Sequence, residues 1–133
     1  MHQVLERARR QVPVCAPVLD GREREYLLDA FDSGWVSSGG PYVERFEQAW
    51  AAHCGVEHGV ACCNGTAAIH LALKALNIGP GDEVLIPAFS LIVSANMVHL
   101  AGARPVLVDV RPDTWCIDPR RIREKLTSRT RAI

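Results

Sequence analysis

The 133-residue sequence is 48% hydrophobic and 23% charged, a composition typical of one soluble globular domain or of part of a larger one. Its fifteen Lys and Arg residues balance fifteen Asp and Glu residues, so net charge gives no argument for binding to nucleic acid or to an anionic membrane. No stretch has the apolar length of a signal peptide core or a membrane span, and we therefore expect a cytoplasmic protein.

The chain is predicted to open with an arm that lacks regular secondary structure. Val12 to Pro17 contains two prolines, and the preceding Arg7-Ala8-Arg9-Arg10 is interpreted as a solvated basic cluster rather than a nucleic-acid site. We therefore divide the sequence into an amino-terminal arm, residues 1–17, and a globular part, residues 18–133.

Two amphipathic helices are predicted next. Asp20 is placed to cap the first helix, because Glu23 three residues later completes a capping-box pattern. Pro41 suits the first turn of a second helix, which we expect to end at Gly55. The small-residue loop between the helices, Trp35 to Gly40, is either a flexible connector or a ligand-facing loop.

The segment from Gly59 to Leu76 organises the chain. A run of small and apolar residues at about Val60 to Cys63 predicts a strand, and apolar residues at helical spacing follow the Asn64-Gly65-Thr66 turn. The unpaired N–H groups of a helix start favour an anion, Gly65 lets the backbone approach it, and Thr66 adds a hydroxyl donor. A phosphate site is therefore one interpretation. An ordinary helix start capped by Asn64 is the other.

Two further strands follow, separated by a helix. Glu83 to Pro87 is a short apolar run typical of a buried parallel strand, and Arg104 to Val110 is the third strand. Leu91 to Leu100 suits a helix between them, and a short helix is expected from about Arg120 to Leu126. Arg131-Ala132-Ile133 has the composition of the beginning of a fourth strand.

Short apolar strands that alternate with helices predict an α/β fold with a parallel sheet, whose ligands bind at the carboxyl ends of the strands. Three stretches meet that description and are candidates to line one crevice: Asn64 to Thr66, Ala88 to Leu91, and the residues after Asp109. For Asp109 itself, a catalytic role and a role in capping the next turn both stay open, and the cap is favoured.

The five cysteines are odd in number and irregularly spaced. The adjacent Cys62 and Cys63 do not form a Cys-x-x-Cys motif, and no histidine stands at zinc-ligand spacing from them. We therefore predict buried, reduced thiols rather than disulfides, and we assign no metal site.

Six motifs occur along the chain in an order and spacing that are more specific than any one of them. They are Gly34-Trp35-Val36-Ser37-Ser38-Gly39, Asn64-Gly65-Thr66-Ala67-Ala68, Gly79-Pro80-Gly81-Asp82-Glu83-Val84, Pro87-Ala88-Phe89-Ser90, Gly102-Ala103-Arg104-Pro105-Val106 and Val108-Asp109-Val110. Together they resemble the DegT/DnrJ/StrS family of pyridoxal-phosphate sugar aminotransferases, from about Val12 to the last residue. The resemblance implies the amino-terminal part of the large domain of a fold-type-I, aspartate aminotransferase-like transferase, with an incomplete, mostly parallel sheet.

The resemblance also implies a cofactor and its site. In such transaminases the Gly-Thr pair at the helix start binds the phosphate of pyridoxal 5'-phosphate (PLP), so Asn64, Gly65 and Thr66 are the expected cofactor-binding residues. Leu91 stands where the family usually has an aromatic side chain that stacks on the pyridine ring, and it offers only dispersion contact there. The implied substrate-binding residues lie in the small-residue loop and are Trp35, Ser37, Ser38 and Gly39.

No catalytic residue is assigned. The reaction needs a lysine that bonds covalently to the cofactor and an acidic residue beside the pyridine nitrogen. The only lysines are Lys74, more than two helical turns from Thr66, and Lys125, on a solvated basic face. In the family both catalytic groups lie beyond the position of Ile133, so the sequence resembles about the first third of such an enzyme.

The resemblance implies an enzyme that moves an amino group, from a donor such as glutamate, to a keto group of a nucleotide-linked sugar, and that acts as a homodimer. Two alternatives stay open: a truncated, non-catalytic remnant, and an unrelated doubly wound nucleotide-binding domain. The 133-residue chain by itself is expected to be inactive and not to form a stable folded monomer, because in the family the strands that join the first strand to the others come later in the sequence.

Overall fold

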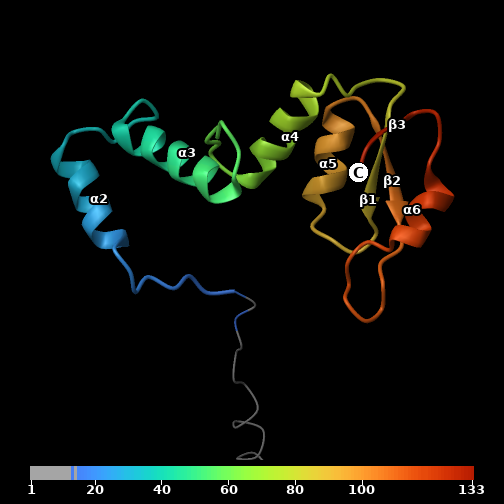
Figure 1. Cartoon of the computed structure of the whole chain (residues 1–133), viewed down its shortest axis with the longest axis horizontal. Helices are drawn as coiled ribbons and strands as arrows, with labels where there is room; N and C mark the ends of the chain where they lie inside the picture. Colours follow the sequence, from blue (N-terminus) through green and yellow to red (C-terminus); the bar gives the residue numbers. More distant parts are fainter. Residues whose placement is uncertain (1–12, 14) are drawn as a thin grey trace, which may run out of the picture. The chain divides into compact units, whose positions relative to one another are not determined.

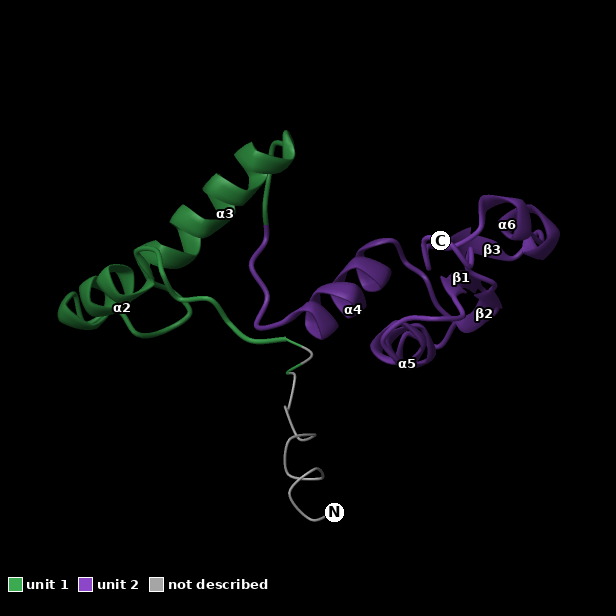
Figure 2. Ribbon diagram, turned by 90° about the horizontal axis from the view of Figure 1, so that it is seen from below, with its two compact units in different colours: residues 1–59 green, residues 60–133 purple. Residues whose placement is uncertain are grey.

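The computed structural model of the chain describes residue 13 and residues 15–133. The predicted basic cluster at Arg7 to Arg10 and most of the predicted arm lie outside the described residues. The chain divides into two compact units, residues 1–59 and residues 60–133, which are coloured separately in Figure 2. The predicted boundary after residue 17 stays a prediction.

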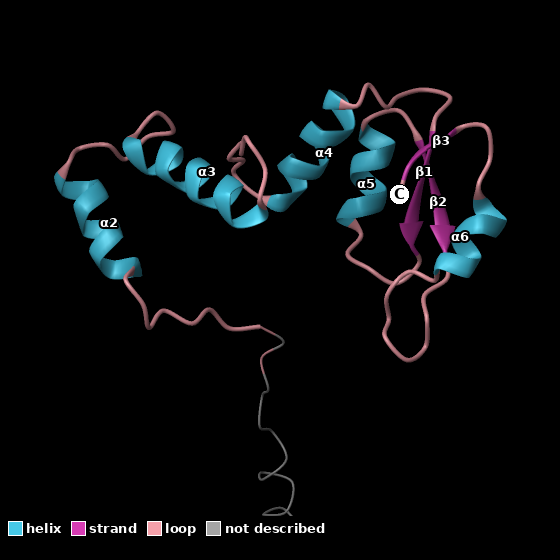
Figure 3. Ribbon diagram, in the orientation of Figure 1, coloured by secondary structure: helices cyan, strands magenta, loops and turns pink. Residues whose placement is uncertain are grey.

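The first unit contains two helices, α2 (Glu23–Asp32) and α3 (Pro41–Cys54), shown in cyan in Figure 3. As predicted, a proline opens α3 and Gly55 ends it, in a left-handed conformation with φ of 68° that glycine adopts without steric cost. Phe46 and Trp50, one turn apart, stack with ring centroids 6.0 Å apart. The two rings therefore lie on the same face of the helix.

The start of α2 differs from the prediction. Arg22 occupies the N-cap position, and no side chain caps the helix. Glu23 is the first helical residue, and its carboxylate accepts a hydrogen bond from the Gly21 N–H at 2.9 Å. The predicted cap by Asp20 is therefore wrong, because a capping box needs the cap directly before the first helical residue and Asp20 stands two residues too early.

The second unit is built on a sheet of three parallel strands in the order β2-β1-β3 (Figure 1). Helices α5 and α6 lie on opposite sides of this sheet in Figures 1 and 2, and α4 packs against α5. The predicted parallel α/β architecture is confirmed. In chain order the elements are α4 (Gly65–Ala75), β1 (Glu83–Pro87), α5 (Val93–Leu100), β2 (Arg104–Val108), α6 (Pro119–Lys125) and β3 (Thr130–Ala132).

The apolar core of this unit lies between the helices α4 and α5 and the sheet. Val84 and Ile86 of β1 contribute to it from the same face, because alternate residues of a strand point to the same side. Leu85 and Val108 are also fully buried. The buried residues of the cluster are Leu73, Ile78, Val84, Ile86, Val98, Ala101 and Ala103.

Two strand predictions need correction. Val60 to Cys63 forms no strand, because the described residues provide no neighbouring strand with which it pairs. The strand β2 ends at Val108, two residues earlier than predicted, and Val110 instead forms an isolated antiparallel bridge with Ile117. The predicted fourth strand is present as β3, which pairs with β1.

The prediction of buried thiols is also wrong, since all five cysteines are free and exposed. The exposure of Cys62 and Cys63 follows from the absence of a strand at Val60 to Cys63. A segment that does not join a sheet has no face that packs on the core, so both side chains stay in contact with solvent.

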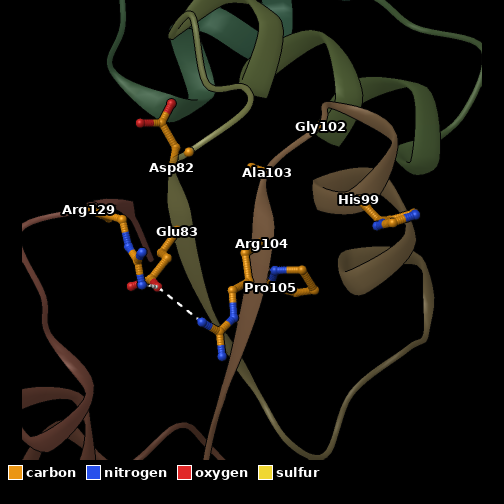
Figure 4. A pocket seen from close by; sticks show the side chains of 9 residues that line it. Asp82, Glu83, His99, Gly102, Ala103, Arg104, Pro105 and Arg129 are labelled. Carbon is orange, nitrogen blue, oxygen red and sulfur yellow. Dashed lines mark hydrogen bonds and ion pairs between the residues drawn. The ribbon is translucent and has the colours of Figure 1, made fainter.

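The amino-terminal ends of the three strands meet at one buried carboxylate. Glu83, the first residue of β1, is 3% exposed. It accepts hydrogen bonds from Thr127 Oγ1 at 2.6 Å and from Arg129 Nη2 at 2.7 Å, and it lies 3.6 Å from Arg104 Nη1. Figure 4 shows Glu83 with Arg104 and Arg129. A buried carboxylate needs such partners, so Glu83 ties β1 to β2 and to the segment that precedes β3.

This cluster predicts acid-sensitive stability. The hydrogen bond from Thr127, followed by that from Arg129, lowers the pKa of Glu83 below its usual 4.5, although burial acts in the opposite direction. A carboxylate with a lowered pKa contributes stability that is fully present above its unfolded-state pKa and is lost as pH falls through its folded-state pKa. The stabilisation by Glu83 should therefore disappear progressively below about pH 4.5.

The test compares urea midpoints of the protein at several pH values. Glu83→Gln should lower the midpoint at pH 7 and weaken its dependence on acid pH. The matched control is Glu57→Gln, at a glutamate whose side chain is 87% exposed, and it should change neither quantity. Equal midpoints for wild type and Glu83→Gln at pH 7 would contradict the proposed tie.

Candidate functional site

Helix α4 begins with a side-chain cap. Asn64 is extended, with φ of −168°, and its side-chain oxygen accepts a hydrogen bond from the Ala67 N–H at 2.9 Å, while its backbone carbonyl accepts from Ala68. The N–H groups of Gly65 and Thr66 and the Thr66 hydroxyl make no hydrogen bond to any described residue. The capped helix start thus keeps two backbone donors and one hydroxyl for an acceptor from outside the chain.

Packing within the chain does not explain why position 65 is a glycine. A Cβ on Gly65 would meet no atom within 4 Å, and its φ is not in the left-handed region. Glycine also has a lower helix propensity than alanine, so the helix alone gives no reason for it. Open space above the exposed donors matches the close backbone approach that a phosphate needs. The interpretation as a phosphate site and the interpretation as a capped helix start therefore describe the same turn. Asn64 is the cap, and Gly65 and Thr66 are the donors.

The Lys74 amine lies at the far end of α4 from this turn. Its Nζ donates a hydrogen bond to the Ala101 carbonyl oxygen, 3.4 Å away, just past the end of α5. Lys125 is the last residue of α6. The contact with Ala101 agrees with the expectation that Lys74 does not reach the helix start.

A pocket of about 430 Å³ lies at the carboxyl ends of β1 and β2. It brings together two of the three predicted crevice stretches, since Phe89 follows β1 and Asp109 follows β2, and the Ala88 N–H continues the ladder to the Val108 carbonyl at 2.8 Å. Neither the α4 turn nor Leu91 is among its lining residues. These are Ala88, Phe89, Asp109, Val110, Pro112, Asp118, Arg120 and Arg121.

A hairpin-like loop borders this pocket, in a stretch before α6 that the sequence predicts to be a loop. The Arg111 N–H donates to the Cys116 carbonyl and the Trp115 N–H to the Arg111 carbonyl, which closes the loop. Trp115 has a left-handed φ of 59°, and its ring centroid lies 4.9 Å from that of Phe89. The local signals, Asp113, Asp118 and Pro119, predict a loop but not its conformation.

The favoured role of Asp109 as a carboxylate cap is not confirmed. Its side chain makes no hydrogen bond to a described residue, while its backbone carbonyl accepts from the Asp118 N–H at 3.0 Å. Asp118 is the actual cap of α6, through an N–H bond from Arg120 at 2.9 Å. Asp118 was the better candidate because it directly precedes the helix-opening Pro119.

The first unit contains its own pocket, of about 470 Å³, beside the start of α3. Trp35, Ser38 and Gly39 line it, which are three of the four predicted substrate-binding residues, whereas Ser37 does not. Among the described residues, no three or more His, Cys, Asp or Glu side chains group closely enough to hold a metal ion. No helix in the described part of the chain is long and apolar enough to cross a membrane.

Comparison with known proteins gives consistent matches. The model of the DegT/DnrJ/EryC1/StrS aminotransferase family matches residues 17–133. A GDP-perosamine synthase of Caulobacter vibrioides is 50% identical over 123 residues, which cover 92% of this chain and 33% of that protein. UDP-4-amino-4-deoxy-L-arabinose–oxoglutarate aminotransferase of Shewanella sediminis is 38% identical over 122 residues, or 92% of this chain and 31% of that protein.

The solved structure of NtdA from Bacillus subtilis with bound cofactor PMP superposes with a TM-score of 0.76 and 31% identity, over 91% of this chain and 30% of that one. This similarity confirms the predicted fold class. The chain spans about a third of the length of the curated relatives it matches.

Proposed function

Because this chain belongs to the DegT/DnrJ/EryC1/StrS aminotransferase family, we propose that it is the amino-terminal part of a PLP-dependent transaminase. The enzyme transfers an amino group, with glutamate as donor, to a keto group of a nucleotide-linked sugar, and acts as a homodimer in the cytoplasm. The names of the Caulobacter and Shewanella relatives, which refer to GDP- and UDP-linked sugars, support the substrate class.

The start of α4 is the observation that carries the cofactor assignment. Its free N–H groups at Gly65 and Thr66, the Thr66 hydroxyl and the open space above Gly65 fit a phosphate group. These residues would hold the PLP phosphate, and Asn64 would keep the turn in shape. When bound, PLP supplies an electron sink for proton removal beside the transferred nitrogen. Leu91 would cover one face of its ring.

The small-residue loop of the first unit is proposed to contact the substrate through Trp35, Ser37, Ser38 and Gly39. The pocket lined by three of these residues supports a ligand-facing loop rather than a simple connector. Residues 18–133 are proposed to form part of one large domain, to which the arm of residues 1–17 is attached.

The proposal predicts that neither lysine of this chain bonds to the cofactor. Lys74 is held at the Ala101 carbonyl, so the 133-residue chain mixed with PLP and reduced with borohydride should give no specific adduct at Lys74 or Lys125. Peptide mass mapping after reduction measures this. A stoichiometric adduct on either lysine, accompanied by transaminase activity, would contradict the assignment.

The DNA that follows the codon for Ile133 tests the proposed function against the alternatives. An open frame that encodes a strand, an acidic residue and then a Ser-x-x-x-Lys-like segment supports the transaminase. A stop codon at that point, combined with no PLP binding by the chain, favours the non-catalytic remnant. Nucleotide binding without any PLP binding favours the doubly wound domain.

An aromatic residue at position 91 should strengthen cofactor binding modestly. Offset stacking between aromatic rings contributes about 0.5–1.5 kcal/mol beyond area burial, so Leu91→Phe should raise PLP affinity by about 2- to 10-fold. A PLP absorbance titration of the full-length protein measures the change. Leu91→Met, which keeps the apolar volume without a ring, is the control and should leave affinity nearly unchanged. Equal PLP affinities for Leu91→Phe and Leu91→Met would show that residue 91 does not contact the pyridine ring.

A further inference from the structure

We propose that the pocket at the carboxyl ends of β1 and β2 binds the base of a guanine nucleotide, with Phe89 as its stacking surface and Asp109 as the acceptor for its N–H groups. The inference rests on the proposed function, because it assigns the nucleotide part of the nucleotide-linked sugar. No other role for these two side chains emerges from the packing of the described chain.

Phe89 supplies an aromatic surface that the chain leaves uncovered. It lines the pocket and is 64% exposed, and its neighbour Trp115 is 59% exposed. The two rings are tilted by 49°, so a base that lies flat on Phe89 is not parallel to Trp115. Trp115 therefore serves to support Phe89 from the side. Aromatic side chains in this setting bind bases by stacking, because every base has a flat π-face.

The backbone of the loop holds Trp115 in an unfavourable conformation. A left-handed φ of 59° is uncommon for a bulky residue, and it persists here because the loop hydrogen bonds and the bridge between Val110 and Ile117 fix it. The loop thus keeps Trp115 against Phe89 at the edge of the pocket. A preformed aromatic surface loses little conformational entropy when a ligand binds.

Asp109 gives the pocket its preference among bases. Its carboxylate accepts no hydrogen bond from a described residue, although the Arg121 guanidinium acts on it electrostatically. A carboxylate has two acceptor oxygens and no donor. Guanine presents two neighbouring donors, N1–H and N2–H, to such a fork. Uracil presents one N–H between two carbonyl oxygens, which a carboxylate repels, so the arrangement selects guanine.

The two arginines of the pocket can contact the phosphates of the same nucleotide. Arg120 bonds to Asp118 through Nε and Nη2, and Arg121 bonds to Glu124 through Nη1. Each guanidinium has five N–H donors in all, so both keep donors for phosphate oxygens. The pocket therefore offers a stacking surface, a base acceptor and phosphate donors within about 430 Å³.

The experiment titrates the full-length protein with GDP and, separately, with UDP, and measures both dissociation constants by calorimetry. Wild type should bind GDP at least about 5-fold more tightly than UDP. Phe89→Ala should weaken GDP binding by about 5- to 150-fold, while Phe89→Tyr should retain it. Asp109→Asn should weaken GDP binding and reduce its advantage over UDP. Asp32→Asn, the same chemical change at an exposed aspartate that does not line the pocket, should alter neither constant.

Equal binding of GDP and UDP by wild type, absence of GDP binding at millimolar concentration, or wild-type GDP affinity in both Phe89→Ala and Asp109→Asn would overturn the inference. Phe89→Tyr controls for a folding defect, because it keeps an aromatic ring at position 89. Loss of GDP binding in this variant, with an unchanged circular dichroism spectrum, also counts against stacking. PLP absorbance and the half-reaction with glutamate are recorded on the same samples. Failure of those two signals overturns the proposed function, whereas their presence without guanine preference overturns only this inference.

Discussion

Replacing Thr66 by Ala is expected to weaken PLP binding to the full-length protein by about 10- to 150-fold. The Thr66 hydroxyl has no hydrogen-bond partner among the described residues, so a bound phosphate would be its acceptor. A hydrogen bond to a charged group contributes on the order of 1.5–3 kcal/mol, which corresponds to that range. Titration of the apo protein with PLP, followed by absorbance, measures the loss.

Asn64→Ala is the matched control for stability, because Asn64 and Thr66 have separable roles in the turn. Asn64 caps the helix through the Ala67 N–H, and removal of such a cap costs about 0.5–2 kcal/mol of stability. Thr66→Ala removes no bond within the chain, and alanine is the better helix former, so the urea midpoint of the apo protein should not fall. If Thr66→Ala lowers stability and leaves PLP affinity intact, the turn is only a helix start.

The same turn shows which features a local sequence pattern predicts. Asn64 before a glycine and a threonine identified the cap, and the proline and glycine at the two ends of α3 identified its bounds. In each case the physical cause lies within four residues: a side chain that reaches a nearby N–H, a fixed φ, or a left-handed glycine. Such features need no information about distant parts of the chain.

The remaining features depend on distant partners. Glu83 was read as part of an apolar strand, and its bonds to Thr127 and Arg129 span 44 and 46 residues. Val60 to Cys63 has the composition of a strand but forms none, because a strand exists only beside another strand. Phe89 and Trp115 meet through the conformation of a loop, which hydrophobic periodicity does not encode.

The 133-residue chain by itself is expected not to behave as a stable folded monomer. In the first unit, α2 has no buried residue, and its apolar residues Leu27 and Phe31 are 71% and 70% exposed. Burying a side chain of this size contributes about 1.5–3 kcal/mol relative to leaving it exposed. Net stability is only about 5–15 kcal/mol for complete domains, so a few such missing contributions consume the margin.

The sheet of the second unit adds to the instability. Its order β2-β1-β3 leaves β2 and the three-residue β3 as open edges, which favour aggregation or pairing with another chain. Scanning calorimetry of the purified chain should therefore show no cooperative transition of a monomer, and hydrogen exchange should show weak protection in the strands. A single sharp transition at micromolar concentration, with protected amides in β1, β2 and β3, would contradict this expectation. It would mean that the core around Val84, Ile86 and Val98 suffices to hold the fold.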